Sequence, residues 1–191
     1  KGHLRLSRSD LRRVLREGAG WTVSEGYGSA ADLEHTEARG CMQGADDEAL
    51  TDRALERGGP QLGTLGSGNH FLEIQVVERI DDQRTAEAFG IQEKGQVCVM
   101  IHCGSRGLGH QVCDDAIADM LKAARKYQID LPDRQLACAP VSSPEGQRYF
   151  AAMAAAANYA WANRQAITHQ VRDAFERVMK AGPGALGLEL V

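Results

Sequence analysis

The stretch GTLGSGNHFLEIQVV, residues 63–77, places a glycine-rich turn directly before a run of side chains that favour β-strands. A second such run, VCVMIH (97–102), follows after a polar connection that carries a short helical signal at TAEAFG (85–90). These two runs are the strongest strand candidates of the sequence. The way in which they pair therefore decides what kind of sheet the protein contains.

Two histidines mark the ends of these strands, since His70 stands just before the first and His102 closes the second. Antiparallel pairing would bring the two imidazoles to one edge of the sheet. Parallel pairing would leave them about 20 Å apart, at roughly 3.3 Å per residue over six residues. Two neutral imidazoles with a carboxylate or thiolate make a workable metal site. The alternative is a pair of strand-end histidines that only hydrogen-bond a loop.

Helical periodicity covers much of the remaining chain. One helix is expected over 10–17, with Asp10 as N-cap and glycines 18 and 20 as its end, and another over 110–127. Ser143 and Pro144 are typical of a helix start, and the long helical segment runs over 143–180. Its expected buried stripe contains Phe150, Met153, Ala157, Trp161, Val171, Phe175 and Val178.

These elements predict an α+β fold in which a mixed or antiparallel sheet packs against helices. The chain reads as one unit over 1–191, with a turn-rich segment at 21–63 and the motifs at 64–110. It begins at Lys1 and stops on the apolar run LGLELV, which is typical of a strand cut off before its partner. We therefore expect a fragment of a larger protein.

Composition excludes several classes of protein. The formal charge of −4 argues against a nonspecific nucleic-acid binder, which would carry a basic stripe. No apolar run approaches the roughly 18 residues that span a membrane. Five cysteines without a C-x-x-C pair give little support for a disulfide framework or a zinc knuckle, so we expect a cytoplasmic protein.

A second possible site follows the second strand, in IHCGSRGLGHQ (101–111). A strand ends, a glycine-rich turn follows and a helix is expected to begin near Gly109, an arrangement that suits anions. Arg106 adds a planar fork suited to phosphate. The alternative is a tight connection with Arg106 in solvent. The loop lacks the Lys-Ser/Thr ending of a Walker A motif, and 66–68 lack the spacing of a nucleophile elbow.

Strand alternation limits which neighbours can join the histidines. It puts Asn69 and Glu73 on one face and His70 on the other, so the three converge only if residues 66–70 are bent. Cys103 should point away from His102 and act as a packed thiol. On the long helix, the polar residues Asn158, Asn163 and Arg164 could line a site beside Trp161 or form a solvated face.

The motifs GTLGSGNHFLEIQ (63–75) and MIHCGSRGLGHQVC (100–113), followed by LPDRQLACAPVSSPEGQRYFAAMAAAANYAWANRQ (131–165), resemble the RtcB family of RNA ligases from about Trp21 onward. The resemblance implies an enzyme that depends on GTP and Mn²⁺. It would join RNA ends bearing a 2′,3′-cyclic phosphate or 3′-phosphate to a 5′-hydroxyl, as in tRNA splicing and RNA repair. A histidine of the family attacks GTP, and GMP then passes to the RNA 3′-phosphate.

The resemblance also implies roles for individual residues. His70 and His102 would bind different ions of a two-manganese site. The nucleotide-binding segment would consist of Asn69, His70, Phe71 and Glu73. Ser105 and Arg106 would bind a phosphate of RNA or nucleotide.

Other parts of the family's site are expected outside these residues. They include a metal-binding Asp, a bridging Cys, a third metal histidine and the guanylylated histidine; Cys41 lacks the context of the bridging residue, and serine is expected where Cys103 stands. We therefore expect an inactive fragment whose partners in the whole enzyme are RNA and an archease-like activator. The alternatives are a metal-dependent phosphoesterase and a noncatalytic nucleotide- or RNA-binding module.

Overall fold

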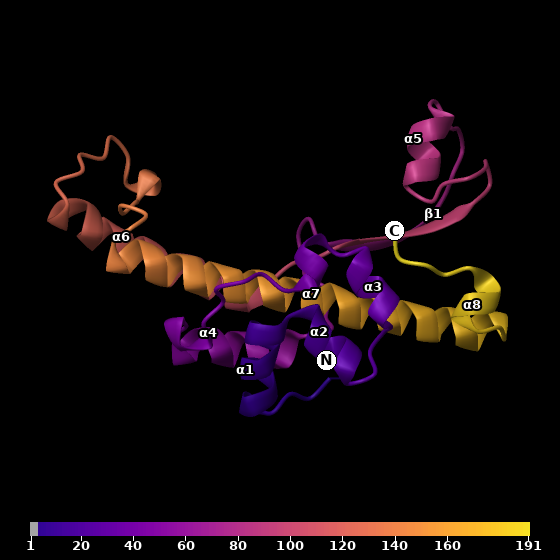
Figure 1. The fold of residues 1–191 in the computed structure, drawn as a ribbon, viewed down its shortest axis with the longest axis horizontal. Coiled ribbons are helices and arrows are strands. Elements are labelled where there is room, and N and C mark those ends of the chain that lie inside the picture. Colours follow the sequence, from indigo (N-terminus) through magenta and orange to yellow (C-terminus); the bar gives the residue numbers. More distant parts are fainter. Residues whose placement is uncertain (1–3) are drawn as a thin grey trace.

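The computed structural model describes residues 4–191, which form a helical body and one small sheet (Figure 1). The helices are α1 (Arg8–Glu17), α2 (Ala19–Ser24), α3 (Ala30–Glu34), α4 (Asp52–Gly58), α5 (Gln83–Ala88), α6 (Arg106–Lys126), α7 (Pro144–Met179) and α8 (Pro183–Leu186). The strands are β1 (Phe71–Val76) and β2 (Val97–His102), and 3-10 turns occupy η1 (Glu37–Gly40), η2 (Asp47–Ala49), η3 (Gly59–Gln61) and η4 (Arg134–Leu136). The expected α+β class is confirmed.

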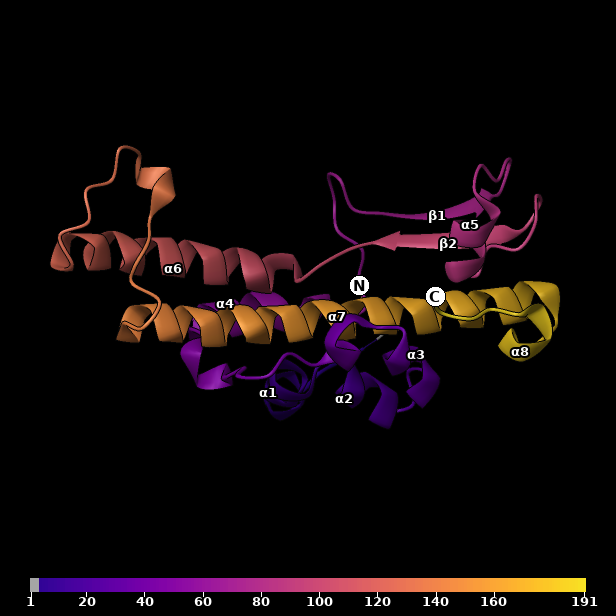
Figure 2. The ribbon, with the colours of Figure 1, turned by 45° about the horizontal axis from the view of Figure 1, so that its top comes forward.

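Helix α7 is the axis of the molecule. Its 36 residues span about 54 Å. The helices α1 to α3 lie on one side of it, and α6 and the ribbon of β1 and β2 lie along the other (Figures 1 and 2). The predicted helix start is confirmed, because the Ser143 side chain accepts the Gly146 N–H and Pro144 is the first helical residue. The helix ends at Met179, and its C-cap Lys180 adopts a left-handed conformation; Gly182 is the N-cap of α8.

The core uses mainly the small side chains of α7, and the stripe expected from the sequence is confirmed only in part, since Trp161 is buried. Phe150 is 43% exposed and Val178 is 76% exposed, so both lie off the packed face. Alanines allow the neighbouring helices to approach closely, and the alanine face is the one that is buried. The main cluster consists of Leu11, Val14, Leu15, Trp21, Ala54, Leu55, Leu62, Leu108, Val112, Ala152, Ala155, Ala156, Tyr159 and Ala162.

The two strands pair antiparallel, with Phe71 opposite His102 and Val76 opposite Val97. This is the pairing that the two histidines required. One face of the ribbon presents Leu72, Ile74 and Val76, and Ile74 is 65% exposed. The connection that carries α5 lies at the far end of the ribbon, away from the start of β1 (Figure 2).

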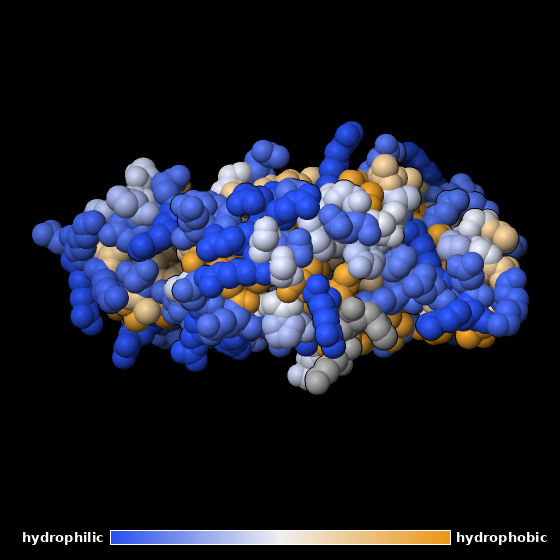
Figure 3. Space-filling model, turned by 90° about the horizontal axis from the view of Figure 1, so that it is seen from below, coloured by the Kyte–Doolittle hydropathy of each residue, from blue (hydrophilic) through white to orange (hydrophobic). Residues whose placement is uncertain are grey.

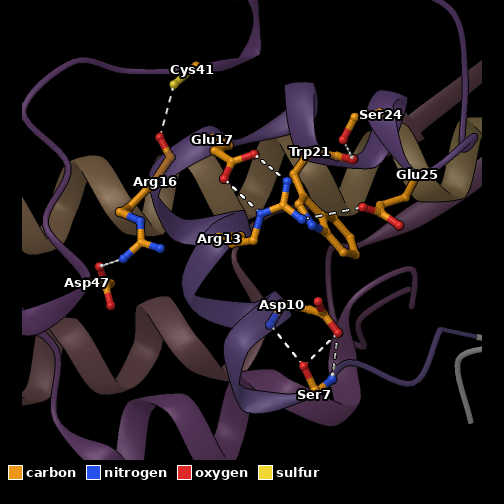
Figure 4. A network of polar contacts seen from close by, with 10 residues as sticks. All are labelled: Ser7, Asp10, Arg13, Arg16, Glu17, Trp21, Ser24, Glu25, Cys41 and Asp47. Carbon is orange, nitrogen blue, oxygen red and sulfur yellow. Dashed lines mark hydrogen bonds and ion pairs between the residues drawn. The ribbon is translucent and has the colours of Figure 1, made fainter.

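The N-terminal helix begins earlier than the sequence suggested. Ser7 is the N-cap of α1, and Asp10 is its third residue, whose carboxylate accepts the Ser7 N–H in a reciprocal capping box (Figure 4). Asp10 is therefore not the cap. Gly18 ends α1, whereas Gly20 lies inside α2 and does not end a helix.

The run LGLELV gives the last residue of α8 and an irregular segment, so the expected strand is absent from these described residues. Viewed from the side of α1 and α4, the surface is mostly hydrophilic, with apolar side chains confined to patches (Figure 3). Within residues 4–191, no helix is both long and apolar enough to cross a membrane.

Candidate functional site

The antiparallel ribbon brings His70 and His102 together at the end where β1 starts and β2 stops. Their ring centroids are 6.3 Å apart, with the planes tilted by 53°. His102 is exposed and stacks on Phe71, at 5.2 Å between centroids and 23° between planes. The His102 imidazole is therefore held by the Phe71 ring, and the His70 imidazole lies against the loop that precedes β1.

The glycine-rich loop before β1 is bent. A turn covers 68–69, and Gly68 has a φ of +77°, a left-handed conformation that glycine adopts without strain. Gly66 is needed for a different reason, which is the space that its missing side chain leaves. A Cβ atom at this position would overlap Nδ1 of His70 and Nη1 of Arg106, so the absence of a side chain allows both groups to lie against the loop backbone.

Cys103 lies closer to the histidines than expected. It is buried, as predicted for a packed thiol. Its Sγ atom lies 3.5 Å from Nδ1 of His70 and 3.5 Å from the carbonyl oxygen of Thr64. Strand alternation relates Cys103 only to the adjacent His102. In the antiparallel ribbon, Cys103 comes one residue after His102 and His70 one residue before Phe71, which places the thiol against the other imidazole.

The loop after β2 leads into α6 earlier than expected, since the helix begins at Arg106 rather than near Gly109. Arg106 has a φ of +55° and is half-buried. Its Nε atom donates to the Thr64 hydroxyl at 3.3 Å, so the side chain faces the site rather than solvent. The Gly107 N–H donates to Oε1 of Gln61 at 2.8 Å, which already satisfies one amide of the helix start.

The other three residues of interest occupy different places around this loop pair. Ser105 is the N-cap residue of α6 and packs against Gly109, where a Cβ atom would overlap the Ser105 hydroxyl. Asn69 is exposed in the turn. Glu73 is exposed two residues after Phe71 on β1, where it lies opposite Met100 of β2. Its carboxylate accepts a hydrogen bond from the Gln75 side chain at 2.9 Å.

Burial of His70 lowers its pKa, and the positive charge of Arg106 lowers it further. Both effects favour the neutral ring. The neutral imidazole is the form that can donate a lone pair to a metal ion. The surroundings of His70 thus suit a ligand better than a cation.

The sequence left undecided whether the polar residues of helix α7 line the site or form a solvated face. Asn158 and Asn163 are fully buried, so neither belongs to a solvated face. Asn163 contacts both loops of the site, and Nη1 of Arg164 donates to the Cys103 carbonyl at 2.9 Å. The signal that could have identified them is the presence of amides on an otherwise alanine-rich helix, because a buried amide needs partners.

The donor set fits part of a metal site. The two histidines offer nitrogen ligands, but within residues 4–191 no three His, Cys, Asp or Glu side chains gather closely enough to hold an ion. Mn²⁺ prefers carboxylate and other oxygen ligands beside imidazole. These described residues therefore do not complete a manganese shell, although the imidazoles suit one.

Comparison with known proteins gives one consistent result. The family model described as tRNA-splicing ligase RtcB matches residues 1–191. Proteins named tRNA-splicing ligase RtcB from Archaeoglobus fulgidus and Methanocaldococcus jannaschii are each 56% identical to the chain over its full length. The protein of that name from Methanococcus maripaludis is 52% identical over the full length.

The match covers only part of each relative. The chain spans 39% of the A. fulgidus protein, 20% of the M. jannaschii protein and 40% of the M. maripaludis protein. Both loops of the site lie within the matched residues. From the family model and these relatives, we conclude that the chain belongs to the RtcB family.

Proposed function

We propose that this chain forms part of the active site of an RNA ligase that joins a 2′,3′-cyclic phosphate or 3′-phosphate end to a 5′-hydroxyl end. The observation that carries the proposal is the antiparallel register, which gathers His70, His102 and Arg106 at one end of the ribbon. Family membership supports the reaction class, because the relatives bear the name tRNA-splicing ligase.

The proposed cofactors are Mn²⁺ and GTP. His70 and His102 would each give one imidazole nitrogen to manganese, which would neutralise phosphate charge when bound. Their rings lie 6.3 Å apart, a separation compatible with ligation of neighbouring ions. The oxygen and sulfur ligands would come from outside these residues, as would the histidine that accepts GMP. The chain alone is thus proposed to be inactive.

The remaining residues are proposed to position the nucleotide and the RNA end. Asn69, Phe71 and Glu73 would hold the guanine nucleotide beside His70. Arg106 would bind a phosphate with Ser105, and its existing bond to Thr64 leaves the guanidinium held in the site before a substrate arrives. Transfer of a phosphoryl or nucleotidyl group depends chiefly on such positioning and charge stabilisation.

The test is RNA joining by the full-length protein that carries these residues, with GTP and Mn²⁺ supplied. The substrates are one RNA with a 2′,3′-cyclic phosphate and one with a 5′-hydroxyl. His70→Ala and His102→Ala should each reduce joining by at least about 100-fold, as expected for loss of a metal ligand. His35→Ala is the control, since His35 is exposed and stands directly after α3, outside both loops of the site.

Two results would contradict the proposal. Release of phosphate without joining would identify a metal-dependent phosphoesterase that uses the same loops. Unchanged joining in both histidine variants would show that the end of the ribbon is not the site of the reaction.

A further inference from the structure

Asn163 connects the two loops that make the candidate site. Its Oδ1 atom accepts the backbone N–H groups of Gly63 at 2.7 Å and Thr64 at 3.2 Å. Its Nδ2 atom donates to the carbonyl oxygens of Thr64 at 3.3 Å and Gly104 at 3.1 Å. The same nitrogen lies 3.3 Å from Sγ of Cys103. One side chain thus joins the loop before β1 to the loop after β2.

The groups that Asn163 holds are the ones that support the site residues. Thr64 accepts Nε of Arg106 through its hydroxyl. Cys103 lies against Nδ1 of His70. A shift of either loop would therefore move the Arg106 guanidinium or the His70 imidazole. Asn163 acts on both through Thr64 and Cys103 and bonds neither directly.

Burial makes this connection specific. Asn163 is fully buried, so an amide atom that lost its partner would have no water to replace it. A carboxamide presents an acceptor and donors in one plane, and here the acceptor serves one loop while the donors reach both. A side chain with only one of these functions cannot make the full set of bonds.

We propose that Asn163 is a positioning residue that sets the relative placement of His70 and Arg106 by fixing Gly63–Thr64 against Cys103–Gly104. The catalytic consequence rests on the proposed ligase function. The geometric part does not, because it concerns where the imidazole lies in the folded protein.

The chain provides a matched control in Asn158, on the same helix. It is also fully buried, and its amide also bonds backbone groups from two segments. Nδ2 donates to the Leu15 carbonyl at 2.9 Å, and Oδ1 accepts the Met42 N–H at 2.7 Å. Leu15 belongs to α1, which lies on the opposite side of α7 from the ribbon (Figure 2), and Met42 lies in the segment after η1. Loss of Asn158 should therefore destabilise the protein without moving the site.

The experiment compares Asn163→Asp and Asn163→Ala with Asn158→Asp and Asn158→Ala in the full-length protein. Aspartate keeps the shape and the acceptor but loses the amide donors, which provides a milder variant if the alanine variant unfolds. The first readout is the NMR resonances of the His70 and His102 rings without cofactor. We expect the Asn163 variants to shift His70, and the Asn158 variants to leave both rings as in the wild type.

The second readout is the turnover number for RNA joining at saturating substrate. A displacement of about 1 Å in a reacting group can lower a rate about 100-fold, so the Asn163 variants should lose at least about tenfold. The Asn158 variants, at comparable thermal stability, should keep wild-type turnover.

The outcomes separate the two proposals. Wild-type His70 resonances in a folded Asn163→Asp variant would overturn the positioning role, as would equal losses of turnover in the two sets of variants. A shift of His70 together with a wild-type protein that joins no RNA would refute the ligase function and retain the positioning role.

Discussion

Gly66 shows how one missing side chain shapes the site. His70 and Arg106 both occupy the space where its Cβ would stand. Its φ lies outside the left-handed region, so alanine can adopt the backbone conformation itself. A substitution here should therefore affect the position of two side chains more than the stability of the fold.

We predict that Gly66→Ala lowers RNA joining about 100-fold while the thermal unfolding midpoint changes little, because the imidazole and the guanidinium must move. Steady-state joining and calorimetry of the same samples measure this. Gly104→Ala is the comparison, since a Cβ there meets no atom within 4 Å. A similar loss in Gly104→Ala would mean that both loops tolerate no side chain, and the specific overlap would not be the cause.

A second residue-scale prediction concerns Asp32, a buried carboxylate that pairs with Arg172 at 2.7 Å. Burial raises its pKa, but hydrogen bonds from Arg172, the Ser29 N–H and Gln165 outweigh this and lower the pKa to about 2. The pKa of Asp32 in the folded protein is below the ordinary aspartate value of 3.8. The stabilisation that the ionised carboxylate gives is therefore present above about pH 4 and is lost as the pH falls toward 2.

Asp32→Asn should therefore destabilise the protein by about 3 kcal/mol at pH 7, and the difference from the wild type should shrink as the pH falls from 4 to 2. Urea unfolding at several pH values measures it. Asp52→Asn, which breaks an exposed pair with Arg8, should change the free energy of unfolding by at most about 1 kcal/mol. A difference for Asp32→Asn that stays constant with pH would contradict the assigned pKa.

At the residue scale, the sequence predicts those contacts that follow from strand ends and strand pairing. The meeting of His70 and His102 follows from two strand ends and one choice of pairing. The contact of Cys103 with His70 requires the register as well, which no local pattern contains. Asn163 is 100 residues from Gly63, and only the packing of α7 under the ribbon brings them together.

At the scale of elements, α7 also anchors α4. The Tyr159 hydroxyl donates to the Gly58 carbonyl at 2.7 Å, and both groups are buried. Tyr159→Phe would leave that carbonyl without its partner, so we predict a loss of about 1–3 kcal/mol in the free energy of unfolding. Chemical denaturation measures this. Tyr149→Phe, on a less buried turn of α7, should change stability by less than about 0.5 kcal/mol; equal effects would contradict the role of the buried bond.

Element boundaries were predictable where local chemistry fixes them. The β2 range and the Ser143 cap follow from composition and capping alone. The start of α6 at Arg106 could not be predicted in this way. A left-handed backbone conformation is unfavourable for an arginine in isolation, and here the Arg106 side chain is held by the Thr64 hydroxyl. The packed face of α7 was predicted correctly at Trp161 but not at Phe150 and Val178, which are exposed while most alanines of the helix are buried.

At the scale of the whole molecule, the incomplete donor set gives a direct prediction. Incubation of residues 1–191 with radiolabelled GTP and Mn²⁺ should give no covalent adduct, because the proposed guanylylated histidine lies outside them. The full-length protein under the same conditions should be labelled, and it serves as the positive control. An acid-labile adduct on the chain alone would show that one of its own histidines accepts GMP, and would contradict the proposal that the guanylylated histidine lies outside these residues.

The hydrogen bonds of Asn163 to the two loops also affect the order in which the site can form during synthesis. The two loops that it joins are translated 100 and 59 residues before it. At about 5–20 residues per second, the ribosome makes them roughly 3 to 20 s before their common partner. Until then the ribbon cannot be fixed in place, and its apolar strands are available to chaperones. The site should therefore be among the last parts of these residues to acquire its native geometry on the ribosome.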